Sequence, residues 1–274
     1  MSRYRGVVGA IHGRVLDPNK TLIPLSVHLR AYNAAPFLQR ALDSLAPLPE
    51  NRVELVLVDD GSTDETPFIL QHAFASRAHV VRVTHPINRG PGPALASGLS
   101  ATGGRWVVAC DADDECVPDG LLAGLDVAET TDAPLVWLDR EEIDPTGQVR
   151  RRSRSVPPGA SHPLQALWRG VTPAHTATLV RRDLALAPQA AVPALRMSED
   201  LIWMMRAVAP LRTFDEVKIV PEIATRYRRR PASLSSVSDR PEALVAPLID
   251  VIRTHLSDAS HWIGEGRLVP DDVT

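Results

Sequence analysis

An acidic cluster, Asp111 to Asp114, directly follows an apolar run, Val107 to Cys110, in the middle of the chain. The apolar run indicates a buried strand, and open α/β sheets bind their ligands at the carboxyl ends of such strands. Asp111 and Asp113, with one residue between them, offer hard oxygen ligands to Mg²⁺ or Mn²⁺, which can hold a diphosphate. A solvated acidic turn that caps the next helix is the alternative, because an isolated Asp-x-Asp pair is common. The rest of the chain favours the metal site.

Two further strand ends are predicted to present polar groups at the same edge of the sheet. Arg30 to Asn33 follow a predicted strand at Leu25 to Leu29, and the pair Asp59-Asp60 follows another at Val53 to Val58. A crevice there could seat a nucleotide, with the ring of Tyr32 for stacking, carboxylates for base and ribose, and a metal ion for the phosphates. Helix capping is the alternative explanation for the aspartate pair.

The elements that must position these residues alternate between strand and helix. Apolar residues at helical spacing indicate one helix that opens near Pro36 and another after Asn88 to Gly90. Ser62 and Glu65 have the spacing of a capping box for the helix that follows them. A third strand is expected at His79 to Thr84. This β-α-β-α order predicts an α/β fold with a parallel, right-handed sheet and helices on both faces.

Four motifs together resemble those of the family-2 glycosyltransferases. They are Leu25 to Asn33, Leu55 to Asp64, Asn88 to Gly90 and Asp111 to Asp114, and their order and spacing agree with the family. The resemblance covers roughly residues 25 to 236. It implies a GT-A fold, in which helices flank a mostly parallel Rossmann-like sheet. It also implies transfer of a sugar from a nucleoside diphosphate to an acceptor hydroxyl, generally with inversion.

The resemblance implies roles for individual residues at the donor site. Tyr32 would stack on or flank the nucleobase, and Asp60 would accept a hydrogen bond from it. Asp111 would hold the ribose. Asp113 would bind the cofactor, Mn²⁺ or Mg²⁺, which would bridge the diphosphate.

Three arginines complete the predicted donor-binding set. Arg89 belongs to the third motif, and Arg228 lies in a basic stretch that resembles a C-terminal segment able to fold over the donor phosphates. Arginine suits that role because its planar guanidinium binds phosphate oxygens bidentately. Arg30 and His28 replace a proline and an apolar residue that the family usually has. Arg30 could reach the nucleotide, whereas His28 is expected to be a hydrogen-bonded core histidine.

A second acidic pair, Glu199-Asp200, follows Ser198 and precedes an amphipathic helix. One interpretation is structural, because serine caps helices and acids favour their positive N-termini. The resemblance supports the other, in which this is the catalytic pair and Asp200 is the general base. Its distance of 87 positions from Asp113 (200 − 113) agrees with the catalytic interpretation. His175, at the start of an expected strand over 174–181, would either line the acceptor pocket or cap that strand.

The chain divides into segments with different predicted roles. Within the second half of the main domain, Arg150 to Arg154 is expected to be an exposed loop. An amphipathic helix is expected over Arg240 to Leu256, and its aliphatic stripe leaves the oligomeric state open. The predicted segments are an N-terminal extension (1–24), a nucleotide-sugar-binding half (25–130), an acceptor-binding half of the same domain (131–236), and a C-terminal helix and tail (237–274).

Composition narrows the compartment and the partners. A net charge of −3 argues against a nucleic-acid partner. Apolar runs fall short of the ~20 residues of a membrane-spanning helix, and the N-terminus lacks the apolar core of a signal peptide. Cys110 and Cys116 cannot form a disulfide framework, which favours a cytoplasmic protein with reduced thiols. Packing is the expected role of these cysteines, with ligation of a soft metal as the alternative.

The expected partners are a nucleotide-sugar donor and an acceptor that is a small molecule, a glycan or a lipid-linked compound. Two other functions compete with glycosyl transfer. A sugar nucleotidyltransferase would carry a triphosphate loop rich in glycine and lysine, but Lys20 and Lys218 are the only lysines. A non-catalytic nucleotide-sugar-binding protein is disfavoured by the presence of both Asp113 and Asp200.

Overall fold

The computed structural model describes eight stretches of the chain: residues 11–12, 23–154, 162–168, 175–192, 194–195, 197–230, 253–254 and 257–265. The predicted N-terminal extension therefore lies almost wholly outside the described residues. The same holds for the helix expected over Arg240 to Leu256, of which only 253–254 are described.

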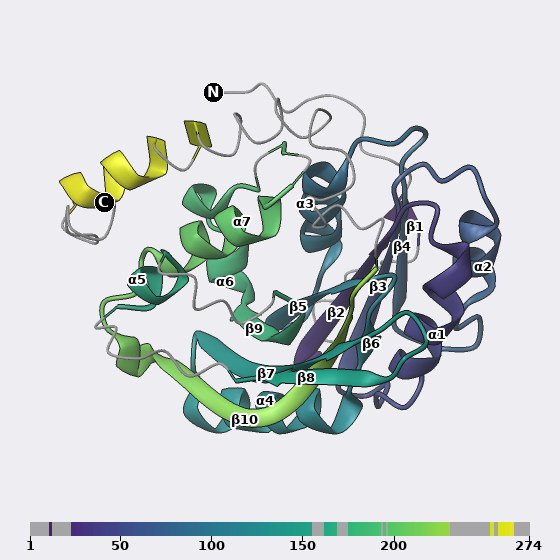
Figure 1. Ribbon diagram of the computed structural model, residues 1–274, viewed down its shortest axis with the longest axis horizontal. Coiled ribbons are helices and arrows are strands. Elements are labelled where there is room, and N and C mark those ends of the chain that lie inside the picture. Colours follow the sequence, from purple (N-terminus) through teal and green to yellow (C-terminus); the bar gives the residue numbers. More distant parts are fainter. Residues whose placement is uncertain are drawn as a thin grey trace.

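One mixed sheet organises the described part of the chain (Figure 1). Its strands are β1 (Ile11–His12), β2 (Leu25–Ala31), β3 (Val53–Asp59), β4 (Val80–Thr84), β5 (Trp106–Asp111), β6 (Glu115–Cys116), β7 (Leu135–Ile143), β8 (Val149–Ser153), β9 (Thr178–Arg181) and β10 (Val217–Arg228). The strand order is β1-β4-β3-β2-β5-β9-β7-β10-β6, and β8 pairs with β7. Strands β4, β3, β2 and β5 are mutually parallel, as the sequence predicts. Strand β9 is antiparallel to both β5 and β7 and joins this half to the parallel pair β7 and β10.

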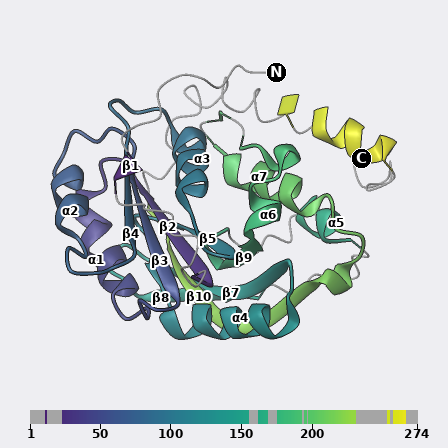
Figure 2. The same cartoon turned by 180° about the vertical axis from the view of Figure 1, so that it is seen from behind.

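Helices cover both faces of the sheet, and the central strands β3 and β5 carry nearly continuous apolar side chains. The helices are α1 (Ala35–Leu45), α2 (Thr66–His72), α3 (Pro91–Ala101), α4 (Pro118–Thr131), α5 (Pro163–Trp168), α6 (Arg182–Ala185) and α7 (Glu199–Val208), with 3-10 turns η1 (His175–Ala177), η2 (Pro188–Ala190) and η3 (Phe214–Glu216). One core joins α1, α2 and α4 to the sheet, and a second joins α3, α5, α6 and α7 to its other face. The two opposite views agree that α3 and α7 lie on the same side of the sheet (Figures 1 and 2).

The predicted capping box of α2 is wrong. Glu65 occupies the N-cap position, and no side-chain capping bond is present there. The Ser62 hydroxyl instead accepts a hydrogen bond from the backbone N–H of Asn33 at 3.0 Å. The free N–H of Thr66 is satisfied by Asp64 Oδ1 at 2.9 Å. Ser62 thus ties the end of β2 to the loop after β3, a contact that local spacing does not reveal.

The predicted loop at Arg150 to Arg154 is also wrong, because most of it forms β8. This strand pairs antiparallel with β7, where Arg152 faces Glu141 and Arg151 faces Glu142 across the ladder. Opposite charges on facing positions stabilise such a pair. The strand has no apolar pattern of its own, and its charged positions face charged positions of β7.

Candidate functional site

A cleft of about 550 Å³ lies at the carboxyl ends of β2, β3 and β5, opposite the N-terminus of α7. It brings together segments that are far apart in sequence. Seven of the nine predicted site residues line it: Arg30, Tyr32, Asp60, Asp111, Asp113, Glu199 and Asp200. The two exceptions are Arg89 and Arg228.

The register of the sheet explains why Arg30 meets Asp111. The two residues are direct partners across the parallel strands β2 and β5. Both point to the face covered by α3 and α7, and Arg30 Nε donates to Asp111 Oδ1 at 2.7 Å. Burial opposes ionisation of Asp111, but the charges of Arg30 and His175 outweigh it and hold the pKa of Asp111 well below its usual value. Asp111 is therefore a carboxylate in the cleft.

His175 links Asp111 to Asp200. Its Nε2 lies 3.2 Å from Asp111 Oδ2, and its Nδ1 lies 2.6 Å from Asp200 Oδ2. Burial disfavours the charged ring, but the two carboxylates raise the pKa of His175 to about 10. Burial likewise opposes ionisation of Asp200, and His175 more than offsets this and lowers the pKa of Asp200 to about 2. Of the two roles expected for His175, the structure agrees with the one in the cleft, because His175 lines the cleft and begins η1, ahead of β9.

We expect the free energy of unfolding to fall as pH rises above neutrality, through His175. Its folded-state pKa of about 10 exceeds the ordinary 6.5, so its stabilisation is full below pH 6.5 and is lost as pH passes through 10. Between these values the slope approaches about 1.4 kcal/mol per pH unit. Urea unfolding at pH 6.5 and pH 8.5 measures it. His175→Gln should lose this pH dependence, and His72→Gln, an exposed histidine, should keep it. An equal slope in His175→Gln and wild type would contradict the assignment.

The acidic pair at the start of α7 has two different environments. Glu199 is buried, and Arg30 Nη1 donates to its Oε1 at 2.8 Å. Asp200 is more open, with 28% of its side chain exposed toward the cleft. Ser198 stands at the N-cap position with a φ of 55°, but its side chain makes no capping hydrogen bond. Simple capping by Ser198 therefore does not explain this motif.

Asp113 reaches the cleft and is paired with Arg230, which the sequence did not single out. Arg230 Nε donates to Asp113 Oδ2 at 2.7 Å, and its Nη2 lies 2.5 Å from the same oxygen. Burial, and then the neighbouring Asp111, raise the pKa of Asp113, and Arg230 opposes them. Both residues lie on the cleft wall. Arg230 is thus the arginine best placed to meet a diphosphate next to Asp113.

The donor set fits a magnesium or manganese ion that is completed by its substrate. Mg²⁺ is commonly held by one or two carboxylates, with substrate phosphates and water as the remaining ligands. Asp113 supplies such a carboxylate at the cleft surface, and Arg230 contacts only one of its two oxygens. Within the residues that the structure describes, no three or more His, Cys, Asp or Glu side chains gather in a ready-made cage. A metal ion here would therefore depend on the diphosphate.

The structure places Arg228, predicted as a phosphate-binding residue, outside the lining of the cleft. Its guanidinium is fully buried, and Nε donates to the backbone oxygen of Asp113 at 2.8 Å. Nη1 donates to the carbonyls of Asp144 and Pro145, both at 3.1 Å, and Nη2 pairs with Glu115. These contacts fasten the end of β10 to the acidic turn and to the β7–β8 turn. Since its hydrogen-bonding groups face the protein, Arg228 holds the acidic turn in place and does not face the cleft.

Arg89 and Asp60 make contacts that the sequence does not predict. Arg89 is exposed outside the cleft, and only its backbone N–H takes part, by donating to Asp60 Oδ1 at 3.0 Å. Asp60 lines the cleft, but its carboxylate also accepts from Gly90 N at 2.8 Å and pairs with His85 Nδ1 at 2.6 Å. Asp60 therefore orders the loop before α3, and a contact with a nucleobase remains a prediction.

His28 does not have the hydrogen bonds expected of a core histidine. It is fully buried, and neither ring nitrogen has a hydrogen-bond partner. Burial, and then the charge of Arg30, lower the pKa of His28 to about 3, so the ring is neutral. The ring packs against α3 at Gly98, where an added Cβ would stand 2.6 Å from Nδ1. The absence of a side chain at Gly98 is what makes room for His28.

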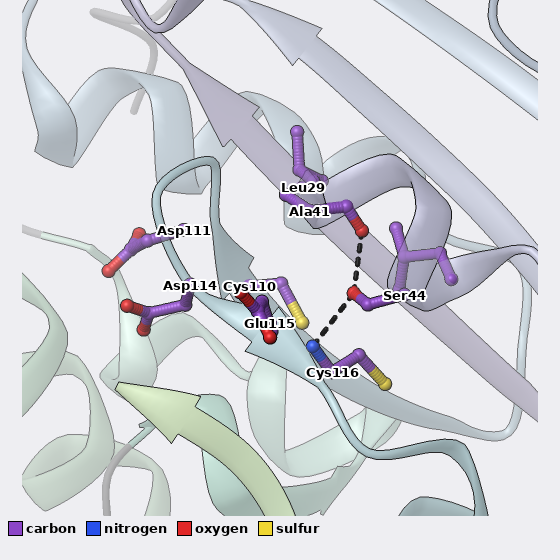
Figure 3. Close-up of a pocket in the computed structure, with 9 residues that line it drawn as sticks. Leu29, Ala41, Ser44, Cys110, Asp111, Asp114, Glu115 and Cys116 are labelled. Atoms are coloured by element: carbon purple, nitrogen blue, oxygen red, sulfur yellow. Dashed lines mark hydrogen bonds between the residues drawn. The ribbon is translucent and has the colours of Figure 1, made fainter. Parts of the chain in front are cut away.

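The two cysteines serve packing, as expected. Both thiols are free and buried, and burial raises their pKa values. Ser44 joins α1 to β6, as Figure 3 shows. Its hydroxyl accepts a hydrogen bond from Cys116 N at 2.9 Å and donates one to Ala41 O at 2.6 Å. In the same view Asp111 lies apart from both thiols. A soft-metal site at the cysteines is not supported, because a metal needs thiolates and burial disfavours them.

Sequence comparisons with known proteins identify the family of this chain. The family model for glycosyl transferase family 2 matches residues 26–186, more than half of the chain. The succinoglycan biosynthesis protein ExoO of Rhizobium meliloti is 32% identical over 121 residues, which cover 44% of this chain. The matched stretch spans 34% of the length of ExoO, 44% of a Nostoc glycosyltransferase and 65% of EpsJ of Bacillus subtilis. Among the described residues, no helix is both long enough and apolar enough to cross a bilayer.

Two solved structures share the fold. Staphylococcus aureus TarS in complex with UDP-GlcNAc superposes with a TM-score of 0.63 and 19% identity, covering 84% of this chain and 66% of that one. The mannosyltransferase PcManGT of Pyrobaculum calidifontis, in complex with GDP-Man and Mn²⁺, gives 0.57 and 18%, covering 86% and 66%. These neighbours confirm the expected GT-A fold. With its family motifs gathered in one cleft, the chain belongs to glycosyltransferase family 2.

Proposed function

We propose that this protein transfers a glycosyl group from a UDP-linked sugar to an acceptor hydroxyl, with inversion and with a divalent metal ion. The observation that carries the proposal is the single cleft shared by Asp111, Asp113 and Asp200. The first two suit a donor, and the third stands across from them on a separate helix. UDP is favoured because TarS has been crystallised with UDP and with UDP-GlcNAc. PcManGT with GDP-Man makes guanosine the alternative base to test.

The donor would occupy the side of the cleft formed by the sheet. Tyr32 is 49% exposed, so a flat ring face is open to a nucleobase. Asp111 would accept hydrogen bonds from the ribose. Asp113 would hold Mn²⁺ or Mg²⁺, which neutralises charge on the diphosphate when it is bound. Arg230, beside Asp113, would contact the phosphate oxygens, for which a guanidinium is well shaped.

Asp200 would act as the general base toward the acceptor. An acceptor hydroxyl has too high a pKa to attack unaided, so a positioned carboxylate takes its proton as the new bond forms. With its pKa lowered to about 2 by His175, Asp200 is ionised at neutral pH. The acceptor oxygen attacks the anomeric carbon, the bond to the diphosphate breaks, and the nucleoside diphosphate leaves with the electron pair. Attack opposite the leaving group inverts the anomeric centre.

A thermal-shift panel of UDP, GDP, dTDP and CDP sugars, each with Mn²⁺ or with EDTA, tests donor binding. The preferred donor should raise the melting temperature more with Mn²⁺, because a ligand that binds the folded state adds about 2.7 kcal/mol at a hundredfold excess over Kd. Asp113→Asn should abolish the metal-dependent part. Asp119→Asn, an exposed aspartate on α4, is the control and should behave as wild type. A full metal-dependent shift in Asp113→Asn would refute the assignment of Asp113.

A further inference from the structure

Arg30 joins the two sides of the cleft. Its side chain is only 9% exposed. Nε donates to Asp111 Oδ1 at 2.7 Å, on the side of the sheet, and Nη1 donates to Glu199 Oε1 at 2.8 Å, on α7. Nη2 lies 3.4 Å from His175 Nε2. A single guanidinium therefore contacts three ionisable side chains from three separate segments.

These contacts close into a ring around the cleft. Asp111 pairs with Arg30 on one side and with His175 on the other. Arg30 continues to Glu199, and His175 continues to Asp200. Glu199 and Asp200 are consecutive residues in the first turn of α7, so the backbone completes the ring. The position of the proposed base is thus tied twice to the donor-side carboxylate Asp111.

Glu199 is buried, so its carboxylate depends on the ion pair with Arg30. Burial, and then the neighbouring Asp200, raise the pKa of Glu199, and Arg30 opposes that rise. Without Arg30 the Glu199 carboxylate would lose its cationic partner in a buried place, which is costly unless it takes up a proton or moves toward water. Either response would change the first turn of α7, where Asp200 also lies.

We propose that Arg30 is a positioning residue for the base: it sets the distance between the donor-side carboxylate Asp111 and Asp200 by holding Glu199. The proposal deepens the proposed function and rests on it. Arg30 acts through Glu199 and need not touch the donor. The fork of an arginine is suited to this task, because its planar donors point in fixed, diverging directions that the single ammonium of lysine lacks.

Four variants test whether Arg30 positions Asp200 through Glu199. Arg30→Met keeps the length of the aliphatic stem without the charge, and Arg30→Lys keeps the charge without the fork. Arg30→Met combined with Glu199→Met removes both partners and leaves no unpaired buried carboxylate. Arg52→Met, at a partly exposed ion pair with Asp126 and Glu129, is the matched control. Each is measured for melting temperature, donor Kd and kcat.

Arg30→Met should lower kcat by about 10²-fold, the scale of a roughly 1 Å misplacement, with donor Kd within about threefold of wild type. Arg30→Lys should recover part of the lost kcat. The double variant should regain melting temperature but not kcat. A parallel loss of donor affinity and kcat in Arg30→Met would instead make Arg30 a donor contact. If the double variant recovers kcat as well as melting temperature, the role of Arg30 is only to neutralise the charge of Glu199.

A crystal structure of the double variant separates this proposal from the proposed function. If Arg30 positions the base, the Asp200 carboxylate moves relative to Asp111, whatever reaction the protein catalyses. An unmoved Asp200 would overturn the positioning role even in an active enzyme. Absence of transfer by the wild-type protein with every donor would overturn the proposed function alone.

Discussion

Replacing Asp200 with asparagine is expected to lower the rate of sugar transfer by about 10²–10⁴-fold, because the variant cannot accept the acceptor's proton. Donor affinity should stay near wild type, since a general base acts in the transition state and contributes little to holding the donor. Asparagine keeps the size of the side chain and can still accept a hydrogen bond from His175, which lies 2.6 Å away. Steady-state turnover and calorimetric donor Kd measure the two effects separately.

Asp183→Asn is the matched control for this experiment. Asp183 also lies in the first turn of a helix, α6, but is exposed and paired with Arg181 outside the cleft. It should transfer sugar at the wild-type rate. Wild-type turnover in Asp200→Asn would show that Asp200 is not the base. His175 would be a poor replacement, because its pKa of about 10 keeps it protonated at neutral pH. Glu199 would then be the next residue to test.

Replacing Arg228 should damage folding, whereas replacing Arg230 should damage nucleotide binding. Arg228→Met would leave the carbonyls of Asp113, Asp144 and Pro145 without their donor. Because the Arg228 side chain is fully buried and holds these partners, the free energy of unfolding should fall by about 1–3 kcal/mol. Arg230 is 31% exposed and pairs with Asp113 at the cleft, so Arg230→Met should cost about 1 kcal/mol or less.

Urea unfolding and nucleotide titration distinguish the two arginines. Arg230→Met should weaken binding of the nucleoside diphosphate about tenfold or more while leaving that of the nucleoside nearly unchanged, since charge-assisted bonds to phosphate are strong. Two results would contradict this account. One is a stable Arg228→Met protein with a selective loss of diphosphate affinity, and the other is an Arg230→Met protein that binds the diphosphate as wild type does.

Much of the fold follows from periodicity in the sequence. The apolar runs that became β3 and β5 are buried on both faces, so their pattern is nearly continuous and easy to read. The polar residues after them meet at one edge because the strands are parallel. That rule alone places Asp60 and Asp111 in a common cleft. The acidic pair of α7 could be assigned to the same site only through the family resemblance.

Details that depend on partners distant in the sequence could not be predicted. Strand β8 has only one apolar residue, Val149, and two of its arginines lie opposite Glu141 and Glu142 of β7, which are 11 and 9 positions earlier in the chain (152 − 141 and 151 − 142). Within the basic run after Tyr227, only the tertiary structure shows that Arg228 points into the protein and Arg230 toward the cleft. The link from Arg30 to Glu199 spans 169 positions, and the sequence near either residue does not predict it.

A crystal structure of the protein soaked with UDP and Mn²⁺ tests the central claim most directly. The account predicts the base beside Tyr32, the ribose within hydrogen-bonding distance of Asp111, and an anomalous manganese peak at Asp113. It also predicts that Arg230 contacts the diphosphate while Arg228 stays buried. A nucleotide bound outside this cleft, or a manganese peak remote from Asp113, would contradict the account.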